Sequence, residues 1–442
     1  MNRNERHVVI TGAGLMAPLG LDPAGVFEAV CQGRSATSLR APFDTSDFPS
    51  RVLGMLPDDI DLLIGMRKDQ SRYFRKNTKV MCRDTQIAVG SAGRAVVDAG
   101  FPPGEFKTDP VLPTVDHTRM GTLFGAGFIP AEIDEFGPTA AAAMDADRNV
   151  VLSKWGADGI PLMYPLWLLK FLPNMLSCHI GIIWDCQGPS NSITCDEAAG
   201  LLAVGEAFRH VARGTADVML TGGAESKINP SSILRLVLLG NATTQHNERP
   251  ASAHRPFDAA HDGSVCAEGA ATLVIETAEH AASRGETPKA RIAGFASACA
   301  ATKPNVPEVS GAAIARAIRA ALKDAECRAA DIDAVVAHGV AVPDQDVAEA
   351  AAISQVLGDV PVTSFTGGMG NVGVAHGPID IALACEMLAR DRVPPVCNCD
   401  TLDSRCPINA VMGSCLDKPL QRVMVLSSAI AAQAGAMVLE KI

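Results

Sequence analysis

The sequence predicts an α/β layered fold, and three observations support this prediction. Short aliphatic runs recur along the 442 residues, among them HVVITG, ADVMLTGGA, DAVVAHG and RVMVLSS. Runs that are apolar throughout are typical of strands in sheets buried on both faces. Helical patterns lie between these runs, and hydrophobic residues make up 48% of the chain. Together these features indicate alternating layers of helix and sheet around a large interior.

The strongest helical pattern spans Ala198–Arg213, where Leu201, Val204, Phe208 and Val211 form one apolar stripe. Similar patterns predict helices at two further places in the chain, which are Gly311–Asp324 and Ile379–Arg392. Further strands are predicted at four aliphatic runs, which are RMGTLFGAG, ATLVIET, ARIAGFA and GAMVLEK.

A polar connection at Glu279–Ile292 divides the chain roughly two to one. On each side an extended run leads through a glycine-containing turn into a long apolar helix. A chain of this length exceeds one ordinary core. We therefore expect two related halves, residues 1–285 and 286–442, packed around a common centre.

Charge and composition exclude several classes of function. The formal net charge is −11 and no basic block is present, which disfavours binding to nucleic acid or to an anionic membrane. The sequence enters a strand within seven residues, leaving no room for a signal peptide. The most apolar window, Pro161–Trp184, contains Lys170 and His179, so core or subunit interface is expected there rather than a membrane span.

The 13 cysteines show no framework spacing, which indicates reduced thiols and a cytoplasmic protein. A late cluster lacks the paired CxxC spacing of a metal site, so no metal is expected there; its members are Cys397, Cys399, Cys406 and Cys415.

An early glycine motif, TGAGLMA at Thr11–Ala17, matches a dinucleotide-binding fingerprint that follows a strand. That fingerprint needs an acidic residue about 20 positions later, and the corresponding stretch VCQGRSATS has none. Pro18 also interrupts the expected helix. A tight structural turn is therefore the favoured interpretation.

Two other segments place reactive side chains at strand ends. SITCDEAAG reads as a strand that turns sharply into the helix at Ala198, with Cys195 and Glu197 as alternative occupants of the turn. The strand IDAVVAHG ends at His338, and Asp346 and Glu349 follow on a helical pattern. Ligands and catalysis gather at strand ends in α/β sheets.

Long blocks in this order resemble the β-ketoacyl synthase family, the condensing enzymes of fatty-acid and polyketide synthesis. The blocks are HVVITGAGLMAPLG, LLKFLPNMLSCHIGIIWDCQGPSNSI, RGTADVMLTGGAE, HRPFDAAHDGSVCAEGAATLVIE and VVAHGVAVPDQDVAEAAAI. The resemblance implies a thiolase-like five-layer αβαβα fold, built from two similar halves, and an obligate dimer. It implies no cofactor, because the acyl chains arrive on the phosphopantetheine arm of an acyl carrier protein.

Condensation in this family uses a cysteine at a helix N-terminus, two histidines and a lysine. The helix dipole lowers the pKa of the thiol, and the histidines stabilise the enolate formed by decarboxylation. In the family pattern six residues separate GPS from the cysteine, and a glycine follows three residues after it. Counting from Gly188–Ser190 places Glu197 at the nucleophile position, with Gly200 in register.

The same comparison assigns the first histidine to His338, the lost lysine to Thr363 and the lost second histidine to Gly368. The family's gating loop corresponds to Ser427–Leu439, which lacks the expected phenylalanines. Three of the four catalytic groups are therefore expected to be absent, so condensation by this chain alone is not expected.

This pattern of loss resembles the chain-length factors, the ketosynthase-β subunits of type II polyketide synthases, in which CDEAAG would correspond to S-E-Q-A-G-G. Such subunits pair with a cysteine-bearing ketosynthase as a heterodimer, or in a higher-order assembly, and help to set chain length. Phe128 and Ile430 are candidates for the tunnel or the interface. Asp346 and Glu349 are expected to organise local hydrogen bonds.

Two enzymatic alternatives stay open at this point. One is a malonyl-carrier-protein decarboxylase that supplies starter units through His338 and Glu197. The other uses Cys195 as a displaced nucleophile or Glu197 as a base.

Overall fold

The computed structural model describes residues 7–105, 107–301, 309–430 and 432–442. The strands of the first half are β1 (Val8–Met16), β2 (Thr37–Ser38), β3 (Leu53–Gly54), β4 (Met120–Ala126), β5 (Ser190–Ile193), β6 (Val218–Ser226) and β7 (Cys266–Thr277). The strands of the second half are β8 (Ala290–Cys299), β9 (Ala334–Val336), β10 (Pro361–Thr363), β11 (Arg392–Val393), β12 (Asn409–Ala410), β13 (Leu416–Asp417), β14 (Arg422–Ser428) and β15 (Gln433–Glu440).

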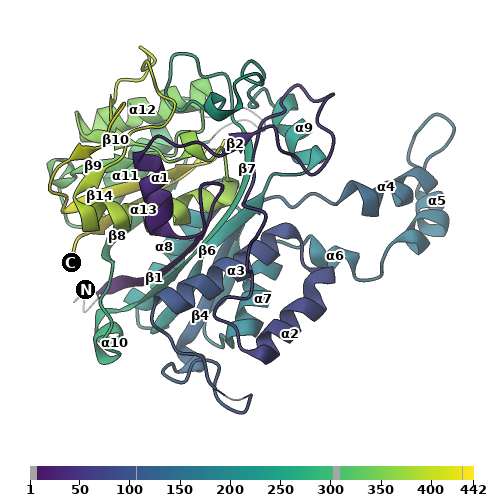
Figure 1. The fold of residues 1–442 in the computed structure, drawn as a ribbon, viewed down its shortest axis with the longest axis horizontal. Helices are drawn as coiled ribbons and strands as arrows, with labels where there is room; N and C mark the ends of the chain where they lie inside the picture. The colour runs from purple at the N-terminus through teal and green to yellow at the C-terminus, as the bar shows by residue number, and fades with distance from the viewer. Residues whose placement is uncertain (1–6, 106, 302–308, 431) are drawn as a thin grey trace.

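The α-helices cover both faces of these strands and lie between them (Figure 1). They are α1 (Pro23–Cys31), α2 (Lys68–Asn77), α3 (Arg83–Asp98), α4 (Ile133–Ala142), α5 (Leu152–Lys154), α6 (Trp167–Lys170), α7 (Met175–Trp184), α8 (Ala199–Ala212), α9 (Pro230–Leu238), α10 (Ala278–Ser283), α11 (Ala312–Asp324), α12 (Pro343–Leu357) and α13 (His376–Arg390). The helices expected at Ala198–Arg213, Gly311–Asp324 and Ile379–Arg392 are confirmed as α8, α11 and α13, with small differences at their ends.

The two halves share one strand order. In the first half the order is β1-β7-β6-β4-β5, and in the second half it is β8-β15-β14-β9-β10. In both halves the first two pairings are antiparallel and the next two are parallel. An antiparallel pairing of Val9 with Arg291 and of Ile10 with Ala290 joins β1 to β8. This repetition confirms the expected fold of two similar halves.

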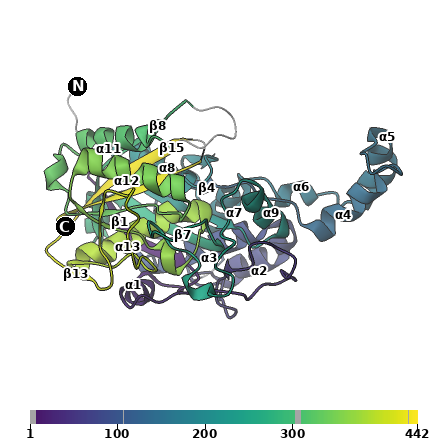
Figure 2. The same ribbon diagram turned by 90° about the horizontal axis from the view of Figure 1, so that it is seen from above.

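Five layers result from packing helices against both halves of this continuous sheet. The buried stripe of α8 packs with α13 between the two halves, where the core includes Leu201, Val204 and Ile379. Helices α3 and α7 cover the outer face of the first half, and α11 and α12 cover that of the second. Figure 2 shows α11 on one side of the molecule and α3 on the other. The order αβαβα places the N-terminus of α8 at the centre.

The interpretation of the early glycine motif as a tight turn is wrong. Strand β1 continues through it as far as Met16, and the turn lies at Ala17–Gly20. A Cβ atom at Gly12 would lie 2.4 Å from the carbonyl oxygen of Ala95, and at Gly14 it would lie 2.0 Å from that of Ser91. Glycine is required here because α3 lies directly against the strand.

An arm that contains α4, α5 and α6 projects away from the layered body in both views (Figures 1 and 2). Several large apolar side chains on and next to this arm are exposed; they are Ile133, Val150, Leu152, Ile160, Leu162, Tyr164, Leu166 and Leu168. The apolar window Pro161–Trp184 therefore has two different parts. The first part belongs to the exposed arm, and the second part, α7, is largely buried. Within the described residues, no helix has the length and apolar character needed to cross a membrane.

Candidate functional site

A strand-to-helix turn presents Glu197 at the centre of the molecule. Strand β5 ends at Ile193, and Asp196 then adopts φ +49°, a conformation uncommon for a residue other than glycine. Helix α8 begins two residues after Glu197, so the side chain stands at the positive end of the helix dipole. This is where acyl-transfer enzymes place a nucleophile, and here it carries a carboxylate.

Glu197 is 8% exposed and is held by two side chains from distant segments. Lys227, which follows β6, places its Nζ 2.5 Å from Oε1. Asn371 donates from Nδ2 to the same oxygen at 2.7 Å, and its Oδ1 accepts from Lys227 at 2.9 Å. Glu197, Lys227 and Asn371 therefore form a closed triangle of charge-assisted hydrogen bonds.

The charges in this triangle are fixed. Burial by itself would raise the pKa of Glu197, but the Lys227 ammonium, His338 and the hydrogen bonds from Lys227 and Asn371 lower it to about 2. Burial would lower the pKa of Lys227, yet the carboxylates Glu197, Glu225 and Asp196 raise it above the usual range. The pair is consequently ionised at neutral pH.

The thiol of Cys195 does not share this environment. Burial raises the pKa of Cys195, and the nearby Cys299 and Asp196 raise it further. A nucleophilic cysteine needs a lowered pKa, because the thiolate is the reactive form. The structure therefore gives no support to Cys195 as a displaced nucleophile.

His338 lies just beyond the end of β9 and faces Glu197, with 3.7 Å between Nε2 and Oε2. Burial lowers the pKa of His338, although Glu197 opposes this shift. Within the described residues, Nε2 of His338 has no hydrogen-bond partner. The ring of His376 packs edge-on against it, with 4.8 Å between the centroids, and both of its ring nitrogens are also unpartnered there.

Two buried carboxylates hold the backbone around His338. Glu349 accepts from the backbone N–H groups of His338 at 2.8 Å and Gly339 at 2.9 Å. Asp346 accepts from the backbone N–H groups of Val340 at 3.0 Å and Phe257 at 2.8 Å. Both acids therefore act on the backbone, as positioning groups for the histidine.

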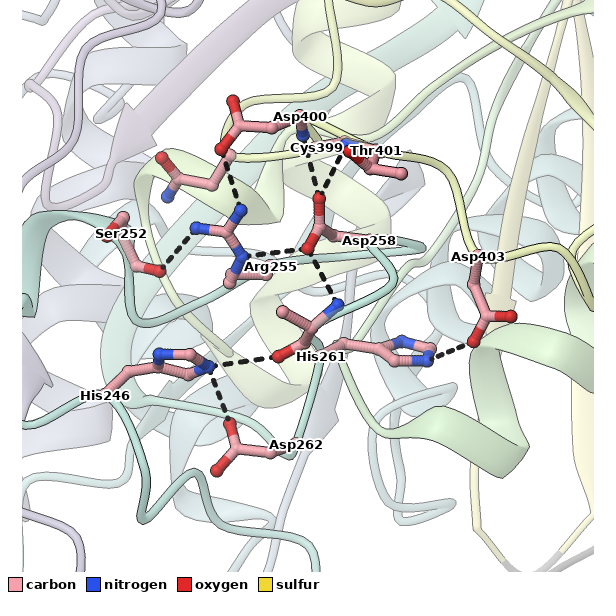
Figure 3. Close-up of polar contacts among 12 residues, drawn as sticks. His246, Ser252, Arg255, Asp258, His261, Asp262, Cys399, Asp400, Thr401 and Asp403 are labelled. Carbon is pink, nitrogen blue, oxygen red and sulfur yellow. Dashed lines mark hydrogen bonds and ion pairs between the residues drawn. The ribbon is translucent and has the colours of Figure 1, made fainter.

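A buried histidine continues this network away from the site. Nδ1 of His261 lies 3.0 Å from Asp346, and Nε2 lies 3.0 Å from Asp403. Figure 3 shows the ring of His261 directed toward Asp403, beside the Arg255–Asp258–Asp400 contacts. Burial would lower the pKa of His261, but hydrogen bonds and charge from both aspartates raise it.

Replacing His261 by glutamine should destabilise the protein by about 2 kcal/mol at pH 5.5, because charged hydrogen bonds to both aspartates are lost. A raised histidine pKa stabilises the fold fully below the unfolded value, near 6.5, and this stabilisation is lost as pH rises through the folded value. Urea unfolding from pH 5 to pH 9 should show the difference from wild type shrinking. His246→Gln, at a histidine on a more exposed loop, is the control. A difference that does not change with pH would contradict the assignment.

The segment that should supply the second histidine meets Glu197 at a different residue from the one expected. A Cβ atom at Gly368 would point at the carbonyl oxygen of Arg34, 2.4 Å away, and at Leu19. Asn371, three residues later, is the residue that reaches Glu197. Thr363, the expected lysine position, ends β10, and three residues later the hydroxyl of Thr366 donates to the carbonyl of Gly339.

Sequence comparison alone also missed Lys227 and His376. Lys227 directly follows the buried strand β6 in GGAESK, which was the available signal for a site residue at a strand end. His376 begins α13 in a glycine-rich stretch, and no local pattern links it to His338.

The cavity above Glu197 is small. It has a volume of about 40 Å³, which is room for roughly two or three waters. Phe128 and Ile430, the two residues expected at a tunnel or interface, both line it, together with Arg235 and Val342. Phe128 is 64% exposed at the mouth. A volume of about 40 Å³ is too small for a long acyl chain.

Known proteins are similar to this chain in fold and in sequence. The family description "Beta-ketoacyl synthase, N-terminal domain" matches residues 5–281, and "Beta-ketoacyl synthase, C-terminal domain" matches residues 289–400. The chain is 30% identical over 449 residues to the actinorhodin polyketide putative beta-ketoacyl synthase 1 of Streptomyces coelicolor, covering 98% of this chain and 88% of that protein.

Two solved structures extend the comparison. One is a type II PKS acyl-carrier protein in complex with its ketosynthase bound to the hexaketide, with a TM-score of 0.83, 26% identity, and coverage of 99% of this chain and 100% of that one. The other is the ishigamide ketosynthase/chain length factor, with a TM-score of 0.81, the same coverage and 24% identity, which shows the fold alone.

A central strand-to-helix elbow, a histidine at a neighbouring strand end and a duplicated five-layer body define a thiolase-like fold of the ketosynthase type. The chain belongs to the β-ketoacyl synthase family.

Proposed function

We propose that this chain is a non-condensing, chain-length-factor-like subunit. It pairs with a cysteine-bearing ketosynthase in type II polyketide or fatty-acid-like synthesis and helps to shape the acyl tunnel. The observation that carries the proposal is the carboxylate of Glu197, held as an anion by Lys227 and Asn371 at the nucleophile position. An ion-paired carboxylate cannot hold an acyl chain as a thioester.

The small cavity supports the same proposal. A condensing site must admit an acyl chain beside its nucleophile, and about 40 Å³ above Glu197 does not. Phe128 and Ile430 line this space, so they are the residues through which a paired subunit would shape a shared tunnel. The acyl chain itself would arrive on the phosphopantetheine arm of an acyl carrier protein, and the subunit would need no cofactor of its own.

Two surface features support a protein partner. Strand β5 ends its sheet, so its outer edge is unpaired within the described residues. The arm beyond β4 exposes apolar side chains, including Leu152 at 84% and Leu162 at 57%. Unpaired edges and apolar patches are costly in water unless another chain covers them. The 13 free cysteines fit a cytoplasmic location for this complex.

The decarboxylase alternative is less well supported. A malonyl group brings a carboxylate and develops an enolate beside His338, and the anionic Glu197 only 3.7 Å away would repel both. Incubation with a malonyl carrier protein tests this alternative directly, since formation of the acetyl carrier protein would favour it.

Co-expression with a cysteine-bearing homologue should yield a 1:1 complex that makes product, while the isolated chain makes none. Changing the partner's cysteine to alanine should abolish product, whereas Glu197→Ala in this chain should leave the chemistry in place. Elongation of acyl groups by the isolated chain would overturn the proposal.

Leu162→Asp on the arm should weaken co-purification of the two proteins at least tenfold, and Leu39→Asp, at another exposed leucine, should not.

A further inference from the structure

A second cavity lies behind the segment that carries Lys227. Its volume is about 270 Å³, and its walls come from the start of α3, the chain after β6 and the base of the arm. This volume is several times that of the cavity above Glu197, and it is enough for a short organic molecule. The cavity is separate from the one above Glu197, with which it shares no lining residue.

Asp84, in the first turn of α3, lines this cavity and is only 4% exposed. The hydrogen bond that it accepts from another described residue comes from the backbone N–H of Ser226, at 3.2 Å to Oδ1. No cation pairs with it in the described part of the chain. A buried carboxyl without a counter-ion is costly, so its presence needs an explanation.

The charged side chains of Arg83 and Glu268, next to Asp84, already pair with each other. Arg83 donates from Nε and Nη2 to the two oxygens of Glu268, at 2.9 and 3.1 Å. Glu268 also accepts from the hydroxyl of Ser226 at 3.0 Å and the backbone N–H of Leu56 at 3.2 Å. Among the described residues, Asp84 is therefore the buried lining acid that lacks a strong partner, since Glu132 is exposed. Burial raises its pKa well above the usual range, and Glu225 and Glu268 add to this shift.

The remaining walls define what could join Asp84. Met55, Ile129 and Ile228 supply an apolar surface. Asn229 and Glu132 are also lining residues, with 3.3 Å between Nδ2 and Oε2. A ligand with one positively charged hydrogen-bond donor would pair with the Asp84 carboxyl. A short hydrocarbon stem on the same ligand would pack against the apolar wall.

We propose that this cavity is a binding site for a small primary ammonium ligand, with Asp84 as its counter-ion and the apolar wall as the seat of its stem. The ammonium supplies the donors that Asp84 lacks, and the ion pair forms in a region of low dielectric where it is strong. Ser226 contacts both Asp84 and Glu268 and directly precedes Lys227. The ligand would therefore touch the segment that delivers Lys227 to Glu197.

Titration calorimetry of the full-length chain with n-butylammonium chloride tests the proposal. We expect saturable 1:1 binding, no binding of the neutral isostere butan-1-ol, and at least a tenfold loss of affinity in Asp84→Asn. Binding should also release protons, because Asp84 passes from its protonated form to the carboxylate. The observed heat should then depend on the ionisation enthalpy of the buffer.

Two further variants separate the site from a general surface effect. Ile228→Phe fills the cavity and keeps Asp84, so it should also weaken binding, and Asp59→Asn, at an exposed carboxyl, should not. Circular dichroism and the unfolding midpoint establish that each variant is folded. The proposal is overturned if no saturable heat appears, if butan-1-ol binds as well as the amine, or if folded Asp84→Asn and Ile228→Phe both retain wild-type affinity.

Discussion

Replacing Lys227 by methionine should destabilise the protein by about 3–5 kcal/mol, because it leaves the Glu197 carboxylate buried without its cation. The side chains of Lys227 and Glu197 are only 9% and 11% exposed, so water cannot replace the lost partner. Urea unfolding monitored by circular dichroism measures the change. The loss should be the largest among single substitutions in the triangle with Asn371.

A matched control and a double variant identify the cause. Lys289→Met removes a lysine paired with Asp98, where both side chains are about a third exposed, and should change the stability by less than about 1 kcal/mol. Adding Glu197→Gln to Lys227→Met removes both charges and should recover most of the loss, as a double-mutant cycle reveals. If Lys227→Met and Lys289→Met lost the same free energy of unfolding, the buried ion pair would not be the cause of the expected loss.

Acid should remove roughly 3 kcal/mol of stability from the wild type relative to Glu197→Gln. The pKa of Glu197 falls from its ordinary value of 4.5 to about 2 in the folded protein, and each unit corresponds to ~1.4 kcal/mol. A depressed carboxyl pKa stabilises the fold fully above the unfolded value. That stabilisation is lost as pH falls from 4.5 through about 2.

Denaturant unfolding of both proteins at pH 6, 4, 3 and 2 measures this effect. The wild type should lose its advantage over Glu197→Gln across the lower half of the series. If the free energy of unfolding of the two proteins changed in parallel with pH, Lys227 and His338 would not stabilise the ionised form of Glu197.

The position of Glu197 at the strand-to-helix turn follows from local sequence. The stretch from Gly188–Ser190 to Glu197 spans one strand and one turn, so counting residues against the family pattern locates the elbow without knowledge of the fold. His338 could be located for the same reason, because it directly follows a short buried strand. Each assignment depends on one short, contiguous stretch of sequence.

The segment from β10 to α13 could not be aligned in this way. It winds through two single 3-10 turns, and Gly370 and Gly373 have positive φ, so no helical or strand period fixes the register. Gly368, the expected histidine position, therefore faces Arg34 rather than Glu197, and the contact of Asn371 with Glu197 emerged only from the fold. The glycines of β1 were misjudged similarly, because the helix that requires them lies about 80 residues further along the chain.

The sequence by itself determined the layered α/β fold and its two related halves, since periodicity is a local property of the chain, and its resemblance to the family pattern placed the glutamate at the nucleophile position. Only the tertiary structure decided what holds that glutamate. Lys227 and Asn371 lie 30 and 174 residues from Glu197, and they meet it because β6 and the segment before α13 converge on the start of α8. Ion pairs between distant residues have no period in the sequence, and burial in the common core gives this one its strength.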